Sequence, residues 1–208
     1  MKTIVCFGDS NTWGANASTR DRYPWEQRWT GLLQRELGDG YRIVEEGLNG
    51  RTTNLDDTIE LHRNGLTYLL PCLETHDPID LITVMLGTND LKERFGRNAS
   101  DIAQAAALVA RTAAAAPVGP NGTTPRVLFM APPPVATLTG FDLTFRGAEE
   151  KSALFARYYA LQAGYNGLPF LDTGAVIRSS DVDGIHFDAE ELPKLAAAVL
   201  AKIHELLA

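Results

Sequence analysis

The sequence contains little cysteine and little histidine. Among its 208 residues there are two cysteines, Cys6 and Cys72, and neither belongs to a Cys-x-x-Cys or Cys/His cluster. We therefore expect free thiols, no metal site and no cofactor. Histidine occurs only four times, so few side chains are available as a general base near neutral pH.

Positive charge and long apolar runs are also scarce. The 19 Lys and Arg residues are outnumbered by 26 Asp and Glu residues, which gives a net charge of −7. Nucleic acid and membrane are not expected partners, because nucleic acids and anionic membrane surfaces attract a cationic face. No apolar run approaches the roughly 18 residues of a membrane span. The run after Lys2 ends at Gly8, too soon for a secretory signal, so we expect a cytoplasmic protein.

Short β-rich runs alternate with longer helical patterns along the chain. We expect strands at 3–7, 41–45, 81–86, 126–131 and 168–171, and helices at 26–37, 58–74, 100–115, 148–165 and 193–207. This alternation favours an α/β fold in which helices cover both faces of a parallel sheet. The length is most simply that of a single domain, residues 1–208.

Segment 15–28 is polar and has no periodicity. Trp13, Trp25 and Trp29 lie in or beside it. A long loop can line a pocket or form a subunit contact. Alternatively, Trp25 and Trp29 anchor the following helix to the core.

A serine follows the first expected strand at a glycine turn. The run Ile4-Val5-Cys6 is followed by Phe7-Gly8-Asp9-Ser10, which is where an α/β enzyme can present a nucleophile. A serine hydroxyl needs a base to accept its proton and an acid to orient that base. Taken alone, Ser10 is more readily explained as a helix N-cap.

His186 is the best candidate for the base. It lies three residues after Asp183, and the intervening Gly184 indicates a turn that can bring the carboxylate to the ring. Asp181 is the second candidate for the acid. The other histidines (His62, His76 and His204) are expected at the surface.

An oxyanion produced by acyl transfer also needs hydrogen-bond donors. Candidates are the backbone N–H groups of Ser10 and Gly50 and the side-chain amide of Asn89, in the run Gly87-Thr88-Asn89-Asp90. All follow expected strands, and the carboxyl ends of parallel strands share one crevice. Asn89 and Asp90 can also be read as turn residues.

These motifs resemble, in order, the four blocks of the SGNH (GDSL-type) hydrolases. They are Gly8-Asp9-Ser10, Gly50, Gly87-Thr88-Asn89-Asp90 and Asp183-x-x-His186. Longer phrases such as CFGDSNTWG, EEGLNGRTTNLDD and VDGIHF are similar to bacterial arylesterases and mycobacterial acyltransferase-type enzymes. The resemblance implies a three-layer α/β/α flavodoxin-like fold with a five-stranded parallel sheet.

The resemblance further implies a site and an activity. Ser10, Asp183 and His186 would form the catalytic triad, and Ser10, Gly50 and Asn89 the oxyanion hole. By position, the substrate-binding residues would be Asn11, Trp13, Phe141, Phe145 and Ile185. Relatives of this kind are homo-oligomers, often octamers, and we expect the same here.

The sequence thus predicts a serine esterase that hydrolyses small short-chain or aryl esters, with acyl transfer to alcohols as a further activity. A second interpretation is a carbohydrate or peptidoglycan O-acetylesterase that uses the same residues. A third is a binding module without activity, which holds a small anion at the helix that starts at Ser10.

Overall fold

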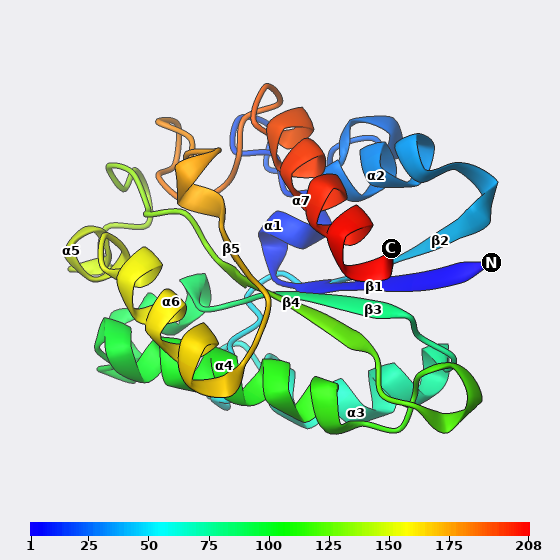
Figure 1. Cartoon of the computed structure of the whole chain (residues 1–208). Coiled ribbons are helices and arrows are strands. Elements are labelled where there is room, and N and C mark those ends of the chain that lie inside the picture. The colour runs from blue at the N-terminus through cyan, green and yellow to red at the C-terminus, as the bar shows by residue number, and fades with distance from the viewer.

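The computed structural model describes all 208 residues and contains one five-stranded parallel sheet. The strand order is β2-β1-β3-β4-β5 (Figure 1). The strands are β1 (Lys2–Gly8), β2 (Tyr41–Gly47), β3 (Leu81–Met85), β4 (Arg126–Ala131) and β5 (Phe170–Asp172). The predicted α/β fold with a five-stranded parallel sheet is confirmed.

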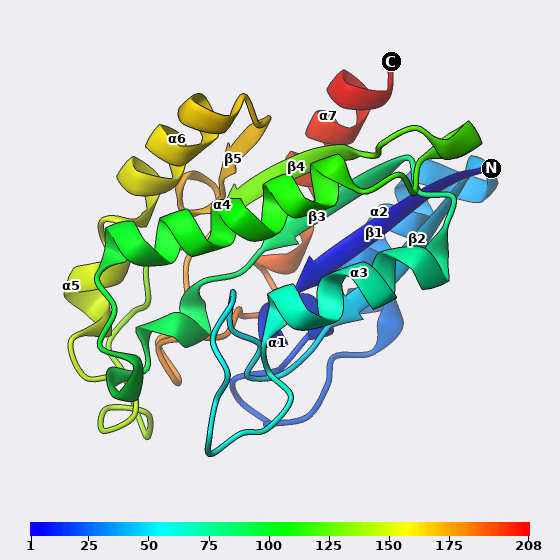
Figure 2. The same cartoon turned by 90° about the horizontal axis from the view of Figure 1, so that it is seen from below.

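Helices cover both faces of this sheet. They are α1 (Ser10–Trp13), α2 (Trp29–Leu37), α3 (Gly65–His76), α4 (Ala99–Ala115), α5 (Ala148–Ser152), α6 (Phe155–Asn166) and α7 (Leu192–Leu207). Figure 1 places α2 and α7 on one face, and Figure 2 shows α3, α4 and α6 on the other. The molecule is therefore a three-layer α/β/α sandwich.

The strands divide their side chains between two apolar cores. Along β1, Val5 and Phe7 join the larger core under α3, α4 and α6, whereas Ile4 and Cys6 join the smaller core under α2 and α7. Successive strand side chains point to opposite faces, so a strand covered on both sides is nearly continuous in apolar character. In β3 all five residues are buried, and only Thr83 is polar.

Three of the predicted helices are shorter or broken in the structure. The helix expected at 58–74 begins only at Gly65, because the Asn64 side chain accepts a hydrogen bond from the Thr67 N–H and caps it. The helix expected at 148–165 is divided into α5 and α6. The helix expected at 26–37 begins at Trp29, since Arg28 is extended.

The last strand is also shorter than expected. β5 begins at Phe170 rather than at residue 168, because Gly167 ends α6 in the left-handed conformation. The Leu168 N–H then bonds the Ala163 carbonyl. Leu168 therefore belongs to the end of the helix, although the hydrophobic pattern predicts that it starts the strand.

The order of the strands creates a crevice at one edge of the sheet. From β1 the chain crosses to β2 on one side and then returns to β3 on the other side of β1. Ligands of open α/β sheets bind outside the carboxyl ends of strands where the order reverses in this way. The segments that follow β1, β2 and β3 carry Ser10, Gly50 and Asn89.

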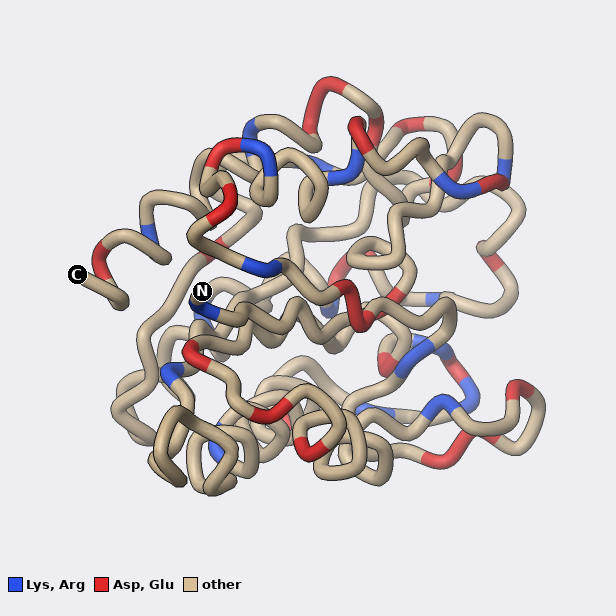
Figure 3. The backbone as a smooth tube through the Cα atoms, turned by 90° about the vertical axis from the view of Figure 1, so that its right-hand side faces the viewer, with Lys and Arg blue, Asp and Glu red and all other residues tan.

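Lys and Arg positions are interspersed with Asp and Glu positions along the chain (Figure 3). None of the helices has the length and apolar character needed to cross a membrane.

Candidate active site

Ser10 is the first residue of α1, immediately beyond the carboxyl end of β1. Asp9 caps this short helix: its side chain accepts a hydrogen bond from the Asn11 N–H at 3.0 Å, and its carbonyl accepts from Thr12 and Trp13. The cap holds the turn between strand and helix, so the Ser10 hydroxyl is fixed at the end of the sheet.

Asp183, His186 and Ser10 form one chain of hydrogen bonds. His186 Nε2 lies 3.0 Å from Ser10 Oγ, and His186 Nδ1 lies 2.6 Å from Asp183 Oδ2. The other carboxylate oxygen, Oδ1, accepts from the backbone N–H groups of Ile185 and His186 at 2.8 and 2.9 Å. The loop therefore orients the acid, and the acid orients the ring.

The environment of Asp183 keeps its carboxyl ionised. Burial favours the neutral form, but hydrogen bonds from His186 and the Ile185 N–H outweigh it, and the pKa of Asp183 is lower than usual. Asp181, the second candidate for the acid, is exposed and makes no contact of this kind. Gly184 has φ +84°, and a Cβ there would lie 2.7 Å from the Thr137 carbonyl oxygen, so this turn requires glycine.

Gly50 offers a free backbone N–H near Ser10. Its φ of +77° is left-handed, and an added Cβ would lie 2.5 Å from Glu60 Oε2. No protein group accepts a hydrogen bond from the Gly50 N–H. The left-handed backbone conformation thus favours glycine at this position.

Asn89 lies in a short 3₁₀ helix (Thr88–Leu91) directly after β3. Its side chain lines the same cavity as Ser10 and Gly50. The neighbouring Asp90 is fully buried and accepts hydrogen bonds from the N–H and the hydroxyl of Thr53. This contact ties the loop of Asn89 to the loop of Gly50, so Asp90 does more than form a turn.

Two buried carboxyl groups lie behind the candidate site. Burial raises the pKa of Asp9 to about 6 and that of Asp90 to about 6, although hydrogen bonds from Asn11 and Thr53 oppose the shift. The negative charge of Asp9 also raises the pKa of Asp90. A carboxyl whose pKa rises on folding weakens the fold as pH rises from about 4 to 6, because the folded state binds more protons there.

A cavity of about 740 Å³ contains the candidate residues. Its apolar wall comprises Trp13, Ala15, Ala17, Ile59, Phe141, Phe145, Val182 and Ile185. The Phe141 ring meets Phe145 edge to face at 6.0 Å and lies 6.3 Å from the His186 ring. Four of the five predicted substrate-binding residues therefore line the cavity.

The exception is Asn11, which does not line the cavity. Its side chain is buried, and its Nδ2 donates to the Ile185 carbonyl at 3.3 Å. This contact joins α1 to the loop of His186. That Asn11 binds substrate stays a prediction.

Segment 15–28 divides between the two roles considered for it. Ala15, Asn16, Ala17 and Arg20 line the cavity in the same chain. Trp29 is fully buried in the smaller core and donates to the Asn11 carbonyl at 3.2 Å, so it anchors α2. Trp25 remains 37% exposed.

Charged residues brace another part of the cavity wall. Asp57 is buried, and its Oδ2 lies 3.4 Å from Lys92 Nζ and also binds Arg94. Glu60 Oε1 contacts the same two cations at 2.7 and 3.0 Å. Lys92 is itself buried, and Glu60, Lys92 and Arg94 line the cavity. These four residues, called the charged brace below, join the segment after Gly50 to the segment after Asn89.

Removing the central acid of the charged brace should weaken the fold. Asp57→Asn is expected to lower the free energy of unfolding at pH 7 by about 1.5–3 kcal/mol, the range for hydrogen bonds to charged groups. Hydrogen bonds from Arg94 and the loop N–H groups overcome burial and hold the pKa of Asp57 well below its usual range. The contribution is thus present above the unfolded pKa of about 3.9 and is lost as pH falls below it.

Urea unfolding of wild type and Asp57→Asn between pH 3 and 7 would check this expectation. Glu205→Gln is the matched control, since it removes a carboxylate from an exposed ion pair with Lys202 and should change stability by less than about 1 kcal/mol. A stability difference for Asp57→Asn that stays constant with pH would contradict the assignment.

The charged brace was not found from the sequence. Asp57 directly precedes the helix expected at 58–74, and Glu60 falls within it. Lys92 and Arg94 follow the Asn89 motif as ordinary polar residues. Asp57 and Lys92 are 35 residues apart, so no local spacing connects them.

Residues 6–190 match the family model of GDSL-like lipases and acylhydrolases. The chain belongs to this family. The prediction of the family from its sequence blocks is confirmed, and so is the prediction of an enzyme that acts on carboxylic esters.

Solved structures of two esterases match 99% of this chain. The inhibitor-bound aryl esterase of M. smegmatis is 40% identical, with a TM-score of 0.93 over 99% of this chain and 100% of that one. Est24, a carbohydrate acetylesterase from Sinorhizobium meliloti, is 41% identical with the same TM-score and coverage. A shorter match, 42% identical over 50 residues, covers 24% of this chain and 20% of the uncharacterized lipoprotein YqeF of Bacillus subtilis.

Proposed function

We propose that this GDSL-like enzyme is a serine esterase that hydrolyses small short-chain or aryl esters through an acyl-enzyme. The observation that carries the proposal is the hydrogen-bond chain from Asp183 through His186 to Ser10, at the wall of a partly apolar cavity. A hydroxyl, a base and an orienting carboxylate in this order form the arrangement that activates serine.

The reaction would proceed in two steps. Ser10 Oγ attacks the ester carbonyl while His186 Nε2 accepts the hydroxyl proton and then delivers it to the leaving alcohol. Asp183 keeps the Nδ1–H of His186 in place and stabilises the imidazolium. The N–H groups of Ser10 and Gly50 and the Asn89 amide would bind the oxyanion. Water, or an acceptor alcohol, then releases the acyl group.

The two walls of the cavity support two substrate classes. Phe141, Phe145 and Ile185 provide an apolar surface for an aryl or short acyl group. Glu60 and Arg94 on the charged wall provide partners for hydroxyl groups. This second observation supports the alternative of a carbohydrate or peptidoglycan O-acetylesterase, and the similarity to Est24 is consistent with it.

The apolar mouth of the cavity supports a further proposal, the homo-oligomer implied by the family resemblance. Ile59 and Val182 line the cavity and expose 72% and 48% of their surfaces. A contact between subunits would cover them.

Ester hydrolysis should decrease as the acyl chain grows, because a cavity of about 740 Å³ must hold both the acyl group and the leaving group. The measurement is the rate of p-nitrophenol release from the acetate, butyrate and octanoate esters, together with acetate release from acetylated xylan. Faster hydrolysis of octanoate than of acetate would contradict a short acyl pocket. A higher kcat/KM on xylan than on p-nitrophenyl acetate would favour the carbohydrate esterase.

A further inference from the structure

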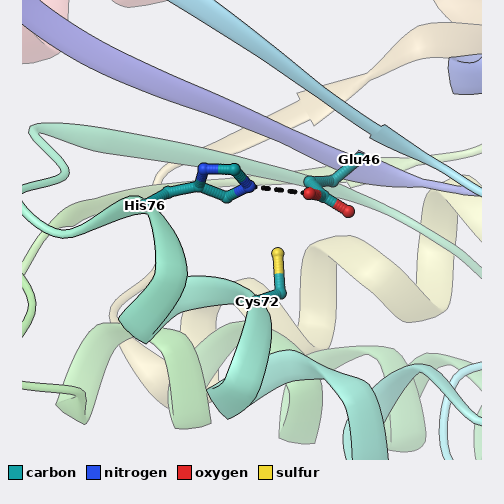
Figure 4. Close-up of side chains that lie close together, drawn as sticks. All are labelled: Glu46, Cys72 and His76. Atoms are coloured by element: carbon teal, nitrogen blue, oxygen red, sulfur yellow. Dashed lines mark hydrogen bonds and ion pairs between the residues drawn. The ribbon is translucent and has the colours of Figure 1, made fainter.

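A cluster of three metal-ligating side chains lies outside the catalytic cavity. Glu46 is on β2, and Cys72 and His76 are on α3. One ligand atom from each lies within 4.8 Å of the others, and Figure 4 shows the Cys72 sulfur and the His76 ring directed toward the Glu46 carboxylate. None of the three lines the catalytic cavity.

Strand alternation and helix periodicity explain why these residues meet. Glu45 points toward α2, where the Thr30 hydroxyl donates to it, so Glu46 points to the opposite face, which α3 covers. Cys72 and His76 are four residues apart on α3 and therefore share one side of that helix. β2 is an edge strand, which leaves the cluster near the surface.

The cluster combines a buried sulfur with two partly exposed ligands. Cys72 is 1% exposed, and the side chains of His76 and Glu46 are 17% and 16% exposed. His76 was expected at the surface, but its Nε2 instead lies 2.7 Å from Glu46 Oε1. An ion can reach the histidine and the carboxylate from solvent, while the sulfur closes the inner side.

The donor set selects the kind of ion. A thiolate, an imidazole nitrogen and a carboxylate oxygen are the ligands of Zn²⁺, which bonds them at about 2.0–2.3 Å in tetrahedral geometry. Hard ions such as Mg²⁺ and Ca²⁺ prefer oxygen ligands alone. Zn²⁺ is therefore the divalent ion that these atoms fit. Three protein ligands leave the fourth position for water.

Neighbouring groups orient the ligands and affect the free energy of metal binding. The Tyr68 hydroxyl donates to Glu46 Oε2 at 3.2 Å and would keep the carboxylate oriented, as outer partners of metal ligands do. The Arg51 guanidinium, stacked on Phe7 and Tyr68, opposes a cation. The charges of the Glu46 carboxylate and a Cys72 thiolate offset that repulsion.

We propose that Glu46, Cys72 and His76 form a binding site for a divalent transition-metal ion, with Zn²⁺ as the fitting ion. The ion would replace the hydrogen bond between His76 and Glu46 and join α3 to the edge of the sheet. Because a thiolate, not a thiol, ligates the ion, binding would release the Cys72 thiol proton to solvent. The cysteine spacing alone predicts no metal site. That prediction does not consider Glu46, which lies 30 residues before His76 in the sequence.

Cobalt titration of the full-length, chelator-treated protein tests the site directly. We expect one Co²⁺ per chain, a thiolate-to-cobalt charge-transfer band in the near ultraviolet, and displacement of Co²⁺ by Zn²⁺. Cys72→Ser should abolish the band. His76→Gln should weaken binding at least about 10–100-fold, since loss of outer partners alone costs that much.

The controls separate this site from adventitious binding. Cys6 remains in every variant, and His204→Gln removes a histidine from the last turn of α7 without touching the cluster, so its titration should match wild type. Circular dichroism verifies that Cys72→Ser is folded, and His76→Gln provides a second, more exposed change. No charge-transfer band in wild type, or the same band in Cys72→Ser, would overturn the proposal. The readout does not use esterase activity.

Discussion

Ser10→Ala is expected to lower kcat for p-nitrophenyl acetate by up to about 10⁶-fold while leaving the fold unchanged. Loss of the nucleophile disables the whole unit, because His186 and Asp183 then have no hydroxyl to activate, and triad residues act together rather than additively. The substitution removes one oxygen atom from a buried position and creates no new charge. The measurement is steady-state hydrolysis, with unfolding followed in parallel.

Ser18→Ala makes the same chemical change at an exposed position of the same chain and should retain wild-type kcat. Labelling with an organophosphonate adds an independent readout, since it should modify wild type at Ser10 and leave Ser10→Ala unmodified. Comparable turnover by Ser10→Ala and wild type would refute the proposed nucleophile. A wild-type protein that neither turns over nor takes the label would support the binding-module interpretation.

Asn89→Ala is expected to reduce kcat about 10²–10³-fold, which corresponds to about 2.7–4 kcal/mol of transition-state stabilisation, with little change in KM. A side-chain donor aimed at the oxyanion contributes mainly when charge develops on the carbonyl oxygen. The side-chain amide of Asn89 donates no hydrogen bond within the protein, and Asn89 lines the cavity. The amide is therefore available for this role. The measurement is kcat and KM for p-nitrophenyl acetate.

Asn49→Ala provides the matched control. Asn49 also lines the cavity but is not a proposed oxyanion donor, so its loss should change kcat less than tenfold. Similar losses of kcat in the two variants would point to a general disturbance of the cavity. An unchanged rate in Asn89→Ala would remove this residue from the oxyanion hole, whatever the result for Ser10.

The candidate triad illustrates what local sequence can specify. Asp183 and His186 are three residues apart, and the left-handed Gly184 between them allows the turn in which one carboxylate binds both the ring and the backbone. The pairing is therefore encoded within four residues. The turn that Asp9 caps after β1 likewise fixes where Ser10 lies.

The sequence by itself determined the alternation of strands and helices, the family and the order of the chemical motifs. These depend on periodicity and short-range geometry, which a single chain segment contains. Only the tertiary structure decided that Asn11 bonds the Ile185 carbonyl, that Asp57 and Lys92 brace the cavity, and that Glu46 meets Cys72 and His76. Such contacts join residues that are 26 or more positions apart in the chain. The packing of whole elements sets these contacts, and no local pattern records them.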